Sequence, residues 1–118
     1  MKAFLIDPKA NTITEIDLPA TGARLKALQD LVEGYIEPLR VFDDGDLIWI
    51  NEEGRLRAEM SAYGFTLVNP DRFEWTGEVI HGRGVVVGHA SRGEESEPKI
   101  TIERLSAAVK MFNHLKEA

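Results

Sequence analysis

The stretch Leu47-Ile-Trp-Ile-Asn-Glu-Glu-Gly-Arg-Leu56 carries an apolar run directly into an acidic tetrapeptide that ends in glycine. Residues 55–60 then alternate between polar and apolar side chains, which is the pattern of a half-exposed strand. A three-residue loop, Glu52 to Gly54, places Ile50 opposite Leu56 and Ile48 opposite Ala58, whereas a two-residue loop would turn one strand over. This pairing predicts a hairpin with Gly54 in the left-handed position that three-residue loops use.

A second hairpin is predicted upstream, because Asp44-Gly45 lies between residues 35–42 and 47–50. A two-residue loop there pairs Val41 with Ile48 and Leu39 with Ile50. The same register places Arg40 opposite Trp49 and Glu37 opposite Glu52. Pro38 donates no backbone hydrogen bond, so we expect its strand to lie at a sheet edge or to be bulged near its start.

The rest of the chain supplies further strands and two helices. Residues 3–6 and 12–18 predict an N-terminal hairpin, and residues 24–32 predict a helix with an apolar stripe of Leu25, Leu28, Leu31 and Val32. Gly34 is placed for a left-handed helix cap. Residues 65–68 fit a strand or a short helix, and residues 78–88 fit one strand interrupted at Gly82.

The last helix is predicted to begin after an N-cap at Thr101. Its apolar stripe is formed by Ile102, Leu105, Ala108, Val109, Phe112 and Leu115. The fold class is therefore α+β: a mainly antiparallel sheet of hairpins and meander strands, with one helix after the N-terminal hairpin and one at the C-terminus. A chain of 118 residues predicts a single domain over residues 1–118.

Composition excludes several function classes. Acidic residues outnumber basic ones by 20 to 14, which argues against direct nucleic-acid binding. The chain has no cysteine, and no apolar run reaches the ~18 residues that a membrane span needs. We therefore expect a cytoplasmic protein with neither membrane attachment nor disulfides.

Metal and cofactor motifs are also missing. The aspartates at 43, 44 and 46 are interpreted as turn formers, since they lack the spacing of a calcium loop. His81 and His89 are too far apart along a strand to share a metal ion, and no phosphate-binding loop or nucleophile motif occurs. No metal, cofactor or catalytic residue is predicted.

Two candidate sites follow from the predicted registers. The first is Arg40, Trp49 and Arg57 on one sheet face, which fits a solvated face, a protein interface or a site for a small anionic ligand. The second is an acidic site of Glu37, Asn51, Glu52 and Glu53. Two close carboxylates there could perform acid–base chemistry, hold a hard cation, or turn outward into solvent.

Three stretches carry a family resemblance: Leu28-Gln-Asp-Leu-Val-Glu-Gly-Tyr-Ile-Glu37, Asn51-Glu-Glu-Gly-Arg-Leu56, and Gly77-Glu-Val-Ile-His-Gly-Arg-Gly-Val-Val-Val-Gly88. Together with residues 1–8, they resemble the domain of unknown function 3846 family, small proteins common in phages, integrative elements and some bacterial genomes. The chain departs from the family pattern at Glu33, where glycine is common, and at residues 58–64, which replace a Leu-Pro-x-Asn segment. The resemblance implies a mobile-element setting and assigns no catalytic residue.

These observations favour a non-enzymatic binding module that acts on a protein partner or a small anionic ligand. The alternatives are an enzyme that uses Glu37 and Glu52, and an acidic protein that blocks nucleic-acid-binding host factors. The predicted Trp49 face also makes a homodimer plausible.

Overall fold

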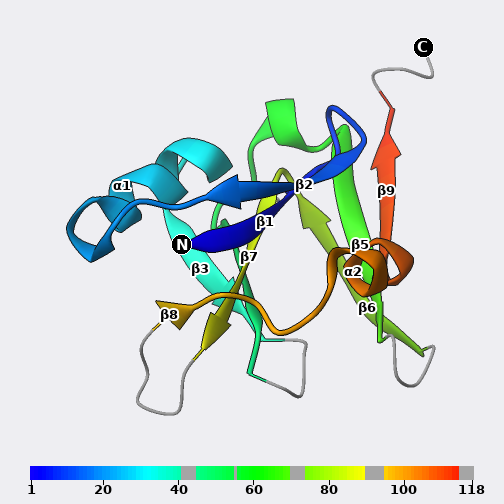
Figure 1. The fold of residues 1–118 in the computed structure, drawn as a ribbon. Helices are drawn as coiled ribbons and strands as arrows, with labels where there is room; N and C mark the ends of the chain where they lie inside the picture. Colours follow the sequence, from blue (N-terminus) through cyan, green and yellow to red (C-terminus); the bar gives the residue numbers. More distant parts are fainter. Residues whose placement is uncertain (41–44, 55, 70–73, 90–94, 115–118) are drawn as a thin grey trace.

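Two antiparallel sheets and two helices make up the part of the chain that the computed structural model describes, residues 1–40, 45–54, 56–69, 74–89 and 95–114 (Figure 1). The larger sheet has the order β2-β1-β7-β4-β3, with β8 paired to β7. Its strands are β1 (Lys2–Asp7), β2 (Thr12–Asp17), β3 (Ile36–Leu39), β4 (Leu47–Asn51), β7 (Gly84–His89) and β8 (Glu95–Ser96).

The smaller sheet has the order β6-β5-β9, with β5 (Tyr63–Asn69), β6 (Glu74–His81) and β9 (Val109–Asn113). The helices are α1 (Thr21–Val32) and α2 (Ile102–Ala108), and a short 3₁₀ helix, η1, spans Ala58–Met60. The predicted α+β class is confirmed. Helix α1 follows the N-terminal hairpin, and α2 lies near the C-terminus.

The N-terminal hairpin is confirmed, since β1 and β2 pair antiparallel with Ile6 opposite Ile13. Helix α1 is confirmed but begins earlier than predicted, at Thr21. Leu28 and Val32 are buried as expected, whereas Leu25 is 57% exposed and does not belong to the core.

The left-handed residue at the end of α1 is Glu33, with φ 65° and ψ 37°, so the predicted cap at Gly34 is wrong. Glu33 occupies the position where the resembling family commonly has glycine, the residue that adopts this conformation without strain. Gly34 is required for another reason, because a Cβ there would lie 2.6 Å from Asn51 Nδ2.

The predicted β3–β4 register is wrong by two residues. Leu39 pairs with Ile48, Pro38 with Trp49 and Glu37 with Ile50. The Val41 pairing and Asp44 of the proposed two-residue loop lie outside the described residues. A shift of two keeps every side chain on its predicted face, so sequence alternation alone could not detect it. Pro38 does lie on an edge strand, as predicted.

The predicted hairpin over residues 47–60 is wrong. Residues 52–54 turn, but no strand follows among the described residues 56–62, and Leu56 is 86% exposed. The second neighbour of β4 is instead β7. The run Val85-Val86-Val87 in β7 is fully buried on both faces, so it gains more from a central position than the half-polar residues 55–60 would.

Residues 78–88 form two strands rather than one interrupted strand. Gly82, with φ +96°, turns the chain out of β6 in the smaller sheet and into β7 in the larger. Of the two alternatives for residues 65–68, the strand is observed, as part of β5.

The last predicted helix is partly wrong. Thr101 caps α2, its hydroxyl accepting from the Arg104 backbone N–H at 3.2 Å, but the helix ends at Ala108. Val109 to Asn113 instead form β9 on the edge of β5 that β6 leaves free. The apolar residues in this segment have a spacing that suits one face of a helix, but pairing with the edge of β5 determines their structure. Leu115 lies outside the described residues.

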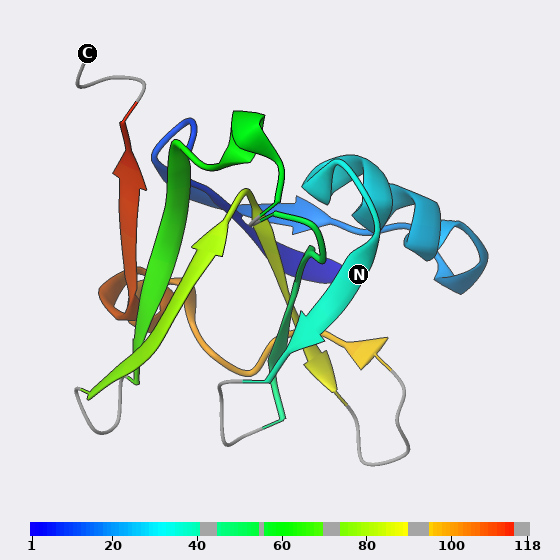
Figure 2. The ribbon, with the colours of Figure 1, turned by 180° about the vertical axis from the view of Figure 1, so that it is seen from behind.

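Two clusters of buried side chains divide the core. The first lies between the two sheets and includes Ile48, Phe65, Ile80 and Val86. The second lies under α1 and includes Leu28, Val32, Leu47, Val85 and Val87. Helix α1 and the smaller sheet therefore cover opposite faces of the larger sheet (Figure 2), and the face that carries Trp49 is covered rather than solvated.

Candidate functional site

Trp49 lies on the covered face of the larger sheet. Pro38 and Val85 flank it across the strands, and its ring is partly buried against the cluster under α1. Its indole Nε1 donates to Glu95 Oε2 at 2.7 Å, and Glu95 also accepts from Arg24 Nη1 at 3.5 Å. The polar edge of the indole is thus bonded within the chain.

Neither of the two arginines predicted to flank Trp49 is paired with it, since Pro38 and Val85 occupy those positions. Arg40 is exposed and follows the end of β3. Arg57 lies outside the strands, where it donates to the Glu33 carbonyl and forms an ion pair with Glu59. A backbone hydrogen bond and the hydrogen bond from Arg57 lower the pKa of Glu59. The strand pairing therefore does not assemble Arg40, Trp49 and Arg57 into one surface.

Asn51 connects the turn after β4 to the end of α1. Its side chain is 4% exposed, and its Nδ2 donates to the Val32 carbonyl at 3.0 Å. Its Oδ1 accepts from the backbone N–H of Glu53 at 2.7 Å, which fixes the turn. The last carbonyls of a helix have no partner within the helix, so Asn51 satisfies one of them and holds the turn with the same amide.

Two arginines complete this junction. Arg57 bonds the Glu33 carbonyl, as described above. Arg83 Nη1 reaches the Leu31 carbonyl at 3.5 Å and Glu33 Oε1 at 3.1 Å, and its Nε lies 3.3 Å from Asp7 Oδ2. Cations are favoured at the negative end of a helix dipole, so the C-terminus of α1 is enclosed by positive and amide donors.

Gly54 brings the same turn against the end of β6. A Cβ at this position would lie 2.5 Å from the backbone carbonyl oxygen of His81, so only glycine fits without displacing backbone. Gly54 does not have a positive φ, and the predicted left-handed position is therefore wrong. Its role is close approach of two main chains rather than turn geometry.

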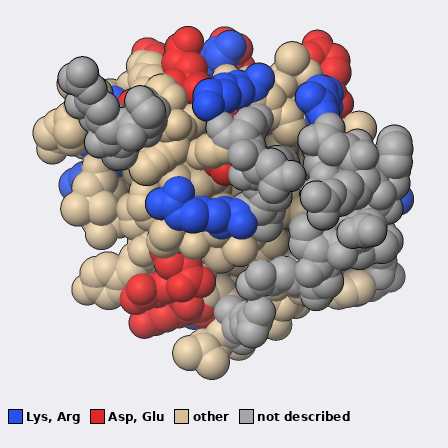
Figure 3. Space-filling model, turned by 90° about the horizontal axis from the view of Figure 1, so that it is seen from below, with Lys and Arg blue, Asp and Glu red and all other residues tan. Residues whose placement is uncertain are grey.

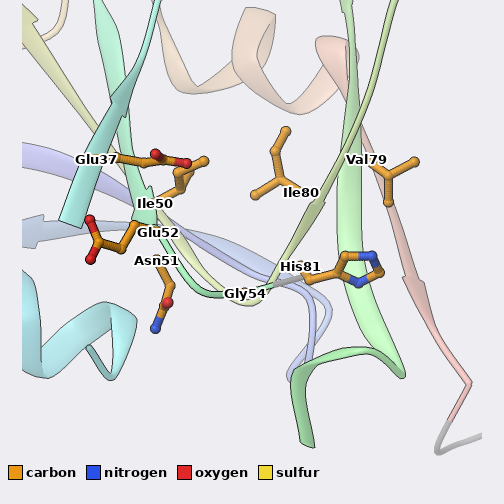
Figure 4. Close-up of a pocket in the computed structure, with 8 residues that line it drawn as sticks. All are labelled: Glu37, Ile50, Asn51, Glu52, Gly54, Val79, Ile80 and His81. Atoms are coloured by element: carbon orange, nitrogen blue, oxygen red, sulfur yellow. The ribbon is translucent and has the colours of Figure 1, made fainter. Parts of the chain in front are cut away.

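A pocket of about 260 Å³ opens beside this turn (Figure 4). One side is formed by β3, β4 and the turn, through Glu37, Ile50, Asn51, Glu52 and Gly54. The other side is formed by three consecutive residues of β6: Val79, Ile80 and His81. The pocket therefore has apolar walls from both sheets and two carboxylates on one side.

The two glutamates of the predicted acidic site meet at this pocket, although not by the predicted pairing. Glu37 is opposite Ile50, and Glu52 begins the turn after β4. Both are exposed and both line the pocket, where they stand on the side away from β6 (Figure 4). The imidazole of His81 points away from them, and its ring meets the ring of Phe112 edge-on at 5.9 Å.

Glu53 turns to a different surface from Glu52. It borders a hollow of about 350 Å³ that is also lined by Gln29, Asp30, Glu33, Gly34 and Tyr35. The residues Asn51, Glu52 and Glu53, predicted as one acidic site, therefore differ in what they contact: the Asn51 side chain borders the pocket but is bonded to the end of α1, Glu52 lines the pocket, and Glu53 borders the hollow.

Sequence reasoning missed the β6 wall of the pocket. Val79 and Ile80 were assigned to a strand continuous with residues 84–88, so nothing brought them near Glu37. The signal available in the sequence was Gly82 itself, because glycine readily adopts the positive φ that this turn has. It also missed Asp46, which is 1% exposed and accepts from the backbone N–H groups of Lys99 and Ile100 rather than merely forming a turn.

The remaining surface gives no sign of a metal site or an acidic stripe. Among the described residues, no group of three or more His, Asp or Glu side chains is placed to hold a metal ion. On the face shown in Figure 3, acidic side chains stand among basic ones. No helix within the described ranges is long and apolar enough to cross a membrane.

Comparison with known proteins supports the resemblance seen in the sequence. A family model described as "Domain of unknown function (DUF3846)" matches residues 1–113. A curated protein, the ATP-dependent dethiobiotin synthetase BioD of Rhodococcus jostii (strain RHA1), is 36% identical over 92 residues. That similarity covers 76% of this chain but only 37% of the synthetase, and no solved structure matches.

Proposed function

We propose that this chain, which belongs to the domain of unknown function 3846 family, is a non-enzymatic binding module whose pocket receives a lysine or arginine side chain of a protein partner. The observation that carries the proposal is the lining of the pocket: apolar side chains of Ile50 and Ile80 from the two sheets, with Glu37 and Glu52 beside them. An apolar stem with a cationic head complements that arrangement.

Charge favours this ligand class over a small anion. Glu37 and Glu52 would repel a phosphate or carboxylate, and the whole chain carries a net charge of −6. The arginine-flanked tryptophan that first suggested an anion site is replaced by a partly buried Trp49 bonded to Glu95. We therefore place the binding surface at Glu37 and Glu52 rather than at Arg40, Trp49 and Arg57.

Two other inferences are part of the proposal. The family resemblance supports a phage or mobile-element setting, in a single cytoplasmic domain. The similarity to an ATP-dependent synthetase is not carried over to activity here, because the sequence has no phosphate-binding loop and spans a minor part of that enzyme.

The test is an NMR titration with N-acetyl-lysine methylamide, N-acetyl-arginine methylamide and the uncharged N-acetyl-norleucine methylamide. The cationic ligands are expected to saturate the amide signals of Glu37, Glu52 and Val79, at an affinity of about 1 mM or weaker for so small a contact. Norleucine methylamide, which keeps the apolar stem, is expected to bind at least fivefold more weakly.

Matched variants separate the pocket from general charge. The double variant Glu37→Gln with Glu52→Gln is expected to abolish the preference for the cation. Glu15→Gln, which removes an equally exposed carboxylate from β2, should preserve it. Equal binding of norleucine and lysine, or equal losses in the pocket and control variants, would refute the proposed function.

A further inference from the structure

We infer that the partner supplies this side chain from an extended segment, which pairs as an added strand with the free edge of β6. The inference rests on the proposed function for the identity of the side chain and adds the main-chain mode of binding. Strand addition draws affinity from backbone hydrogen bonds and specificity from pockets for alternate side chains.

The first support is the topology of the smaller sheet. Strand β6 is terminal in the order β6-β5-β9, and among the described residues it pairs with β5 alone. Natural edge strands are commonly blunted by charged side chains, proline or bulges. Residues 74–81 contain neither lysine nor proline, and their two charged residues, Glu74 and Glu78, are acidic. The register shift with β5 lies between Thr66 and Val68, past the pair of Thr66 with Val79. The edge strand β3, by contrast, carries Pro38.

The second support is the way β6 borders the pocket. Consecutive side chains of a strand point to opposite faces of its sheet. Val79, Ile80 and His81 nevertheless all line the same pocket, so the pocket must run along the edge of the strand rather than over one face. Figure 4 shows β6 with Glu37 and Glu52 across the pocket from it.

The third support is the direction of the backbone groups. The carbonyl oxygen of His81 faces the turn, since it lies 2.5 Å from the position of a Cβ on Gly54. In an antiparallel strand, the N–H and C=O groups of alternate residues point to the same edge. Val79, two residues before His81, is therefore expected to present its backbone donor and acceptor to the pocket.

The occupant follows from charge and from the exposed side chain at this edge. Glu37 and Glu52 select a cationic side chain on one face of the added strand, and Val79, 41% exposed, points to the opposite face and offers an apolar contact there. A partner segment that alternates β-branched residues around one lysine or arginine meets both requirements. An acidic segment would be repelled by the same carboxylates.

The experiment uses the acetylated and amidated pentapeptide Thr-Val-Lys-Val-Thr. Two analogues carry backbone N-methyl groups, one at both valines and the other at the lysine and the C-terminal threonine. In a strand these two sets of N–H groups point to opposite edges, so only one set can bond β6. One analogue should bind about tenfold more weakly than the parent and the other within about threefold.

A protein variant provides the reciprocal measurement. Val79→Pro removes the N–H expected to face the pocket, in an edge position that tolerates proline. It should weaken the parent peptide about fivefold, while Val79→Ala, which keeps the N–H, loses less. Circular dichroism confirms that both variants remain folded, and the N-methyl analogues test the same pairing on the unaltered protein.

Failure here can be distinguished from failure of the proposed function. Strand addition is wrong if the two N-methyl analogues bind with equal affinity, whether weaker than the parent peptide or not. The side-chain pocket is still supported in that case if replacing lysine by norleucine in the peptide weakens binding. If sedimentation shows a dimer that protects the Val79 amide without peptide, a second copy occupies the edge and the inference is overturned.

Discussion

Asn51 and Glu52 are adjacent in the chain, but the polar groups around them differ in whether they are hydrogen-bonded within the chain. On the side of Asn51, the C-terminus of α1 is closed by donors from Asn51, Arg57 and Arg83. On the side of Glu52, a pocket is bordered by two exposed carboxylates and by the edge of β6, which pairs with no strand other than β5 in the described part of the chain. The first arrangement satisfies its polar groups within the chain, and the second is the one that we propose binds a ligand.

This difference distinguishes the polar residue of the turn that stabilises the fold, Asn51, from the one that we propose binds a partner, Glu52. A buried amide whose nitrogen and oxygen are both bonded to backbone stabilises the fold. A carboxylate that lines a pocket without contributing to the fold is available for recognition. The predictions below test this division, beginning with the largest expected change in stability.

The largest effect is expected at the contact between the two regions. Gly54→Ala places a methyl group against the His81 carbonyl and should lower the free energy of unfolding by about 3 kcal/mol. Gly22→Ala is the matched control, because a Cβ there meets nothing within 4 Å, and a helical alanine should be neutral or stabilising by about 0.5 kcal/mol. Urea unfolding of both variants measures the difference.

Asn51→Ala should cost about 2 kcal/mol, because the buried Val32 carbonyl loses its donor and the Glu53 N–H loses its acceptor. Its neighbour provides the comparison: Glu52→Ala should change stability by less than about 0.5 kcal/mol. If chemical denaturation gave equal costs for the two substitutions, the division between a structural and a binding residue would fail.

Tyr63 makes the free energy of unfolding depend on pH in the alkaline range. Burial raises the pKa of its phenol above the ordinary 10.0, and the negative charge of Glu33 adds to the rise. The unfolded chain ionises first, so this contribution to stability is present below pH 10 and is lost as the pH rises through the folded pKa. The loss is at most about 1.4 kcal/mol per pH unit.

Tyr63→Phe removes the ionisable group and should flatten the decline in stability above pH 10. Thermal unfolding from pH 8 to 11 compares the variant with the unaltered protein, whose other titrating groups are the same. An identical slope in both would show that the phenol is not held neutral by its surroundings.

The smallest effect is expected at Glu33. Glu33→Gly relieves the left-handed conformation, which costs roughly 1–2 kcal/mol for a residue with a side chain. It also loses the partly exposed ion pair with Arg83, worth less than about 1 kcal/mol. The net result should be a gain of about 0.5 kcal/mol, whereas Glu33→Ala, which keeps the strain and loses the ion pair, should be destabilising.

Local patterns located most of the elements correctly. The β1–β2 hairpin, α1, the Thr101 cap and the edge position of Pro38 each depend on residues close in the chain. The errors came where distant segments competed for the same partner. The buried strand β7 pairs with β4 in place of residues 55–60. Residues 109–113 form a strand on the edge of β5 instead of continuing the predicted helix.

The candidate sites divide in the same way. The grouping of Arg40, Trp49 and Arg57 depended on two registers, one shifted and one absent, so it did not survive the pairing that the structure shows. Glu37 and Glu52 do line one pocket, although they are not paired across the strands as predicted. Their opposite wall, Val79 to His81, lies far away in the chain and was reached only through the turn at Gly82.

What the sequence by itself determined was the family, the α+β class and the residues that deserved scrutiny, because composition, short turns and helix caps are encoded locally. Which strand lies beside which, and therefore what Asn51 and the two glutamates contact, was decided only by the tertiary structure. A shift of two residues or a change of neighbour leaves the alternation of buried and exposed side chains intact. Only packing between distant strands distinguishes such arrangements.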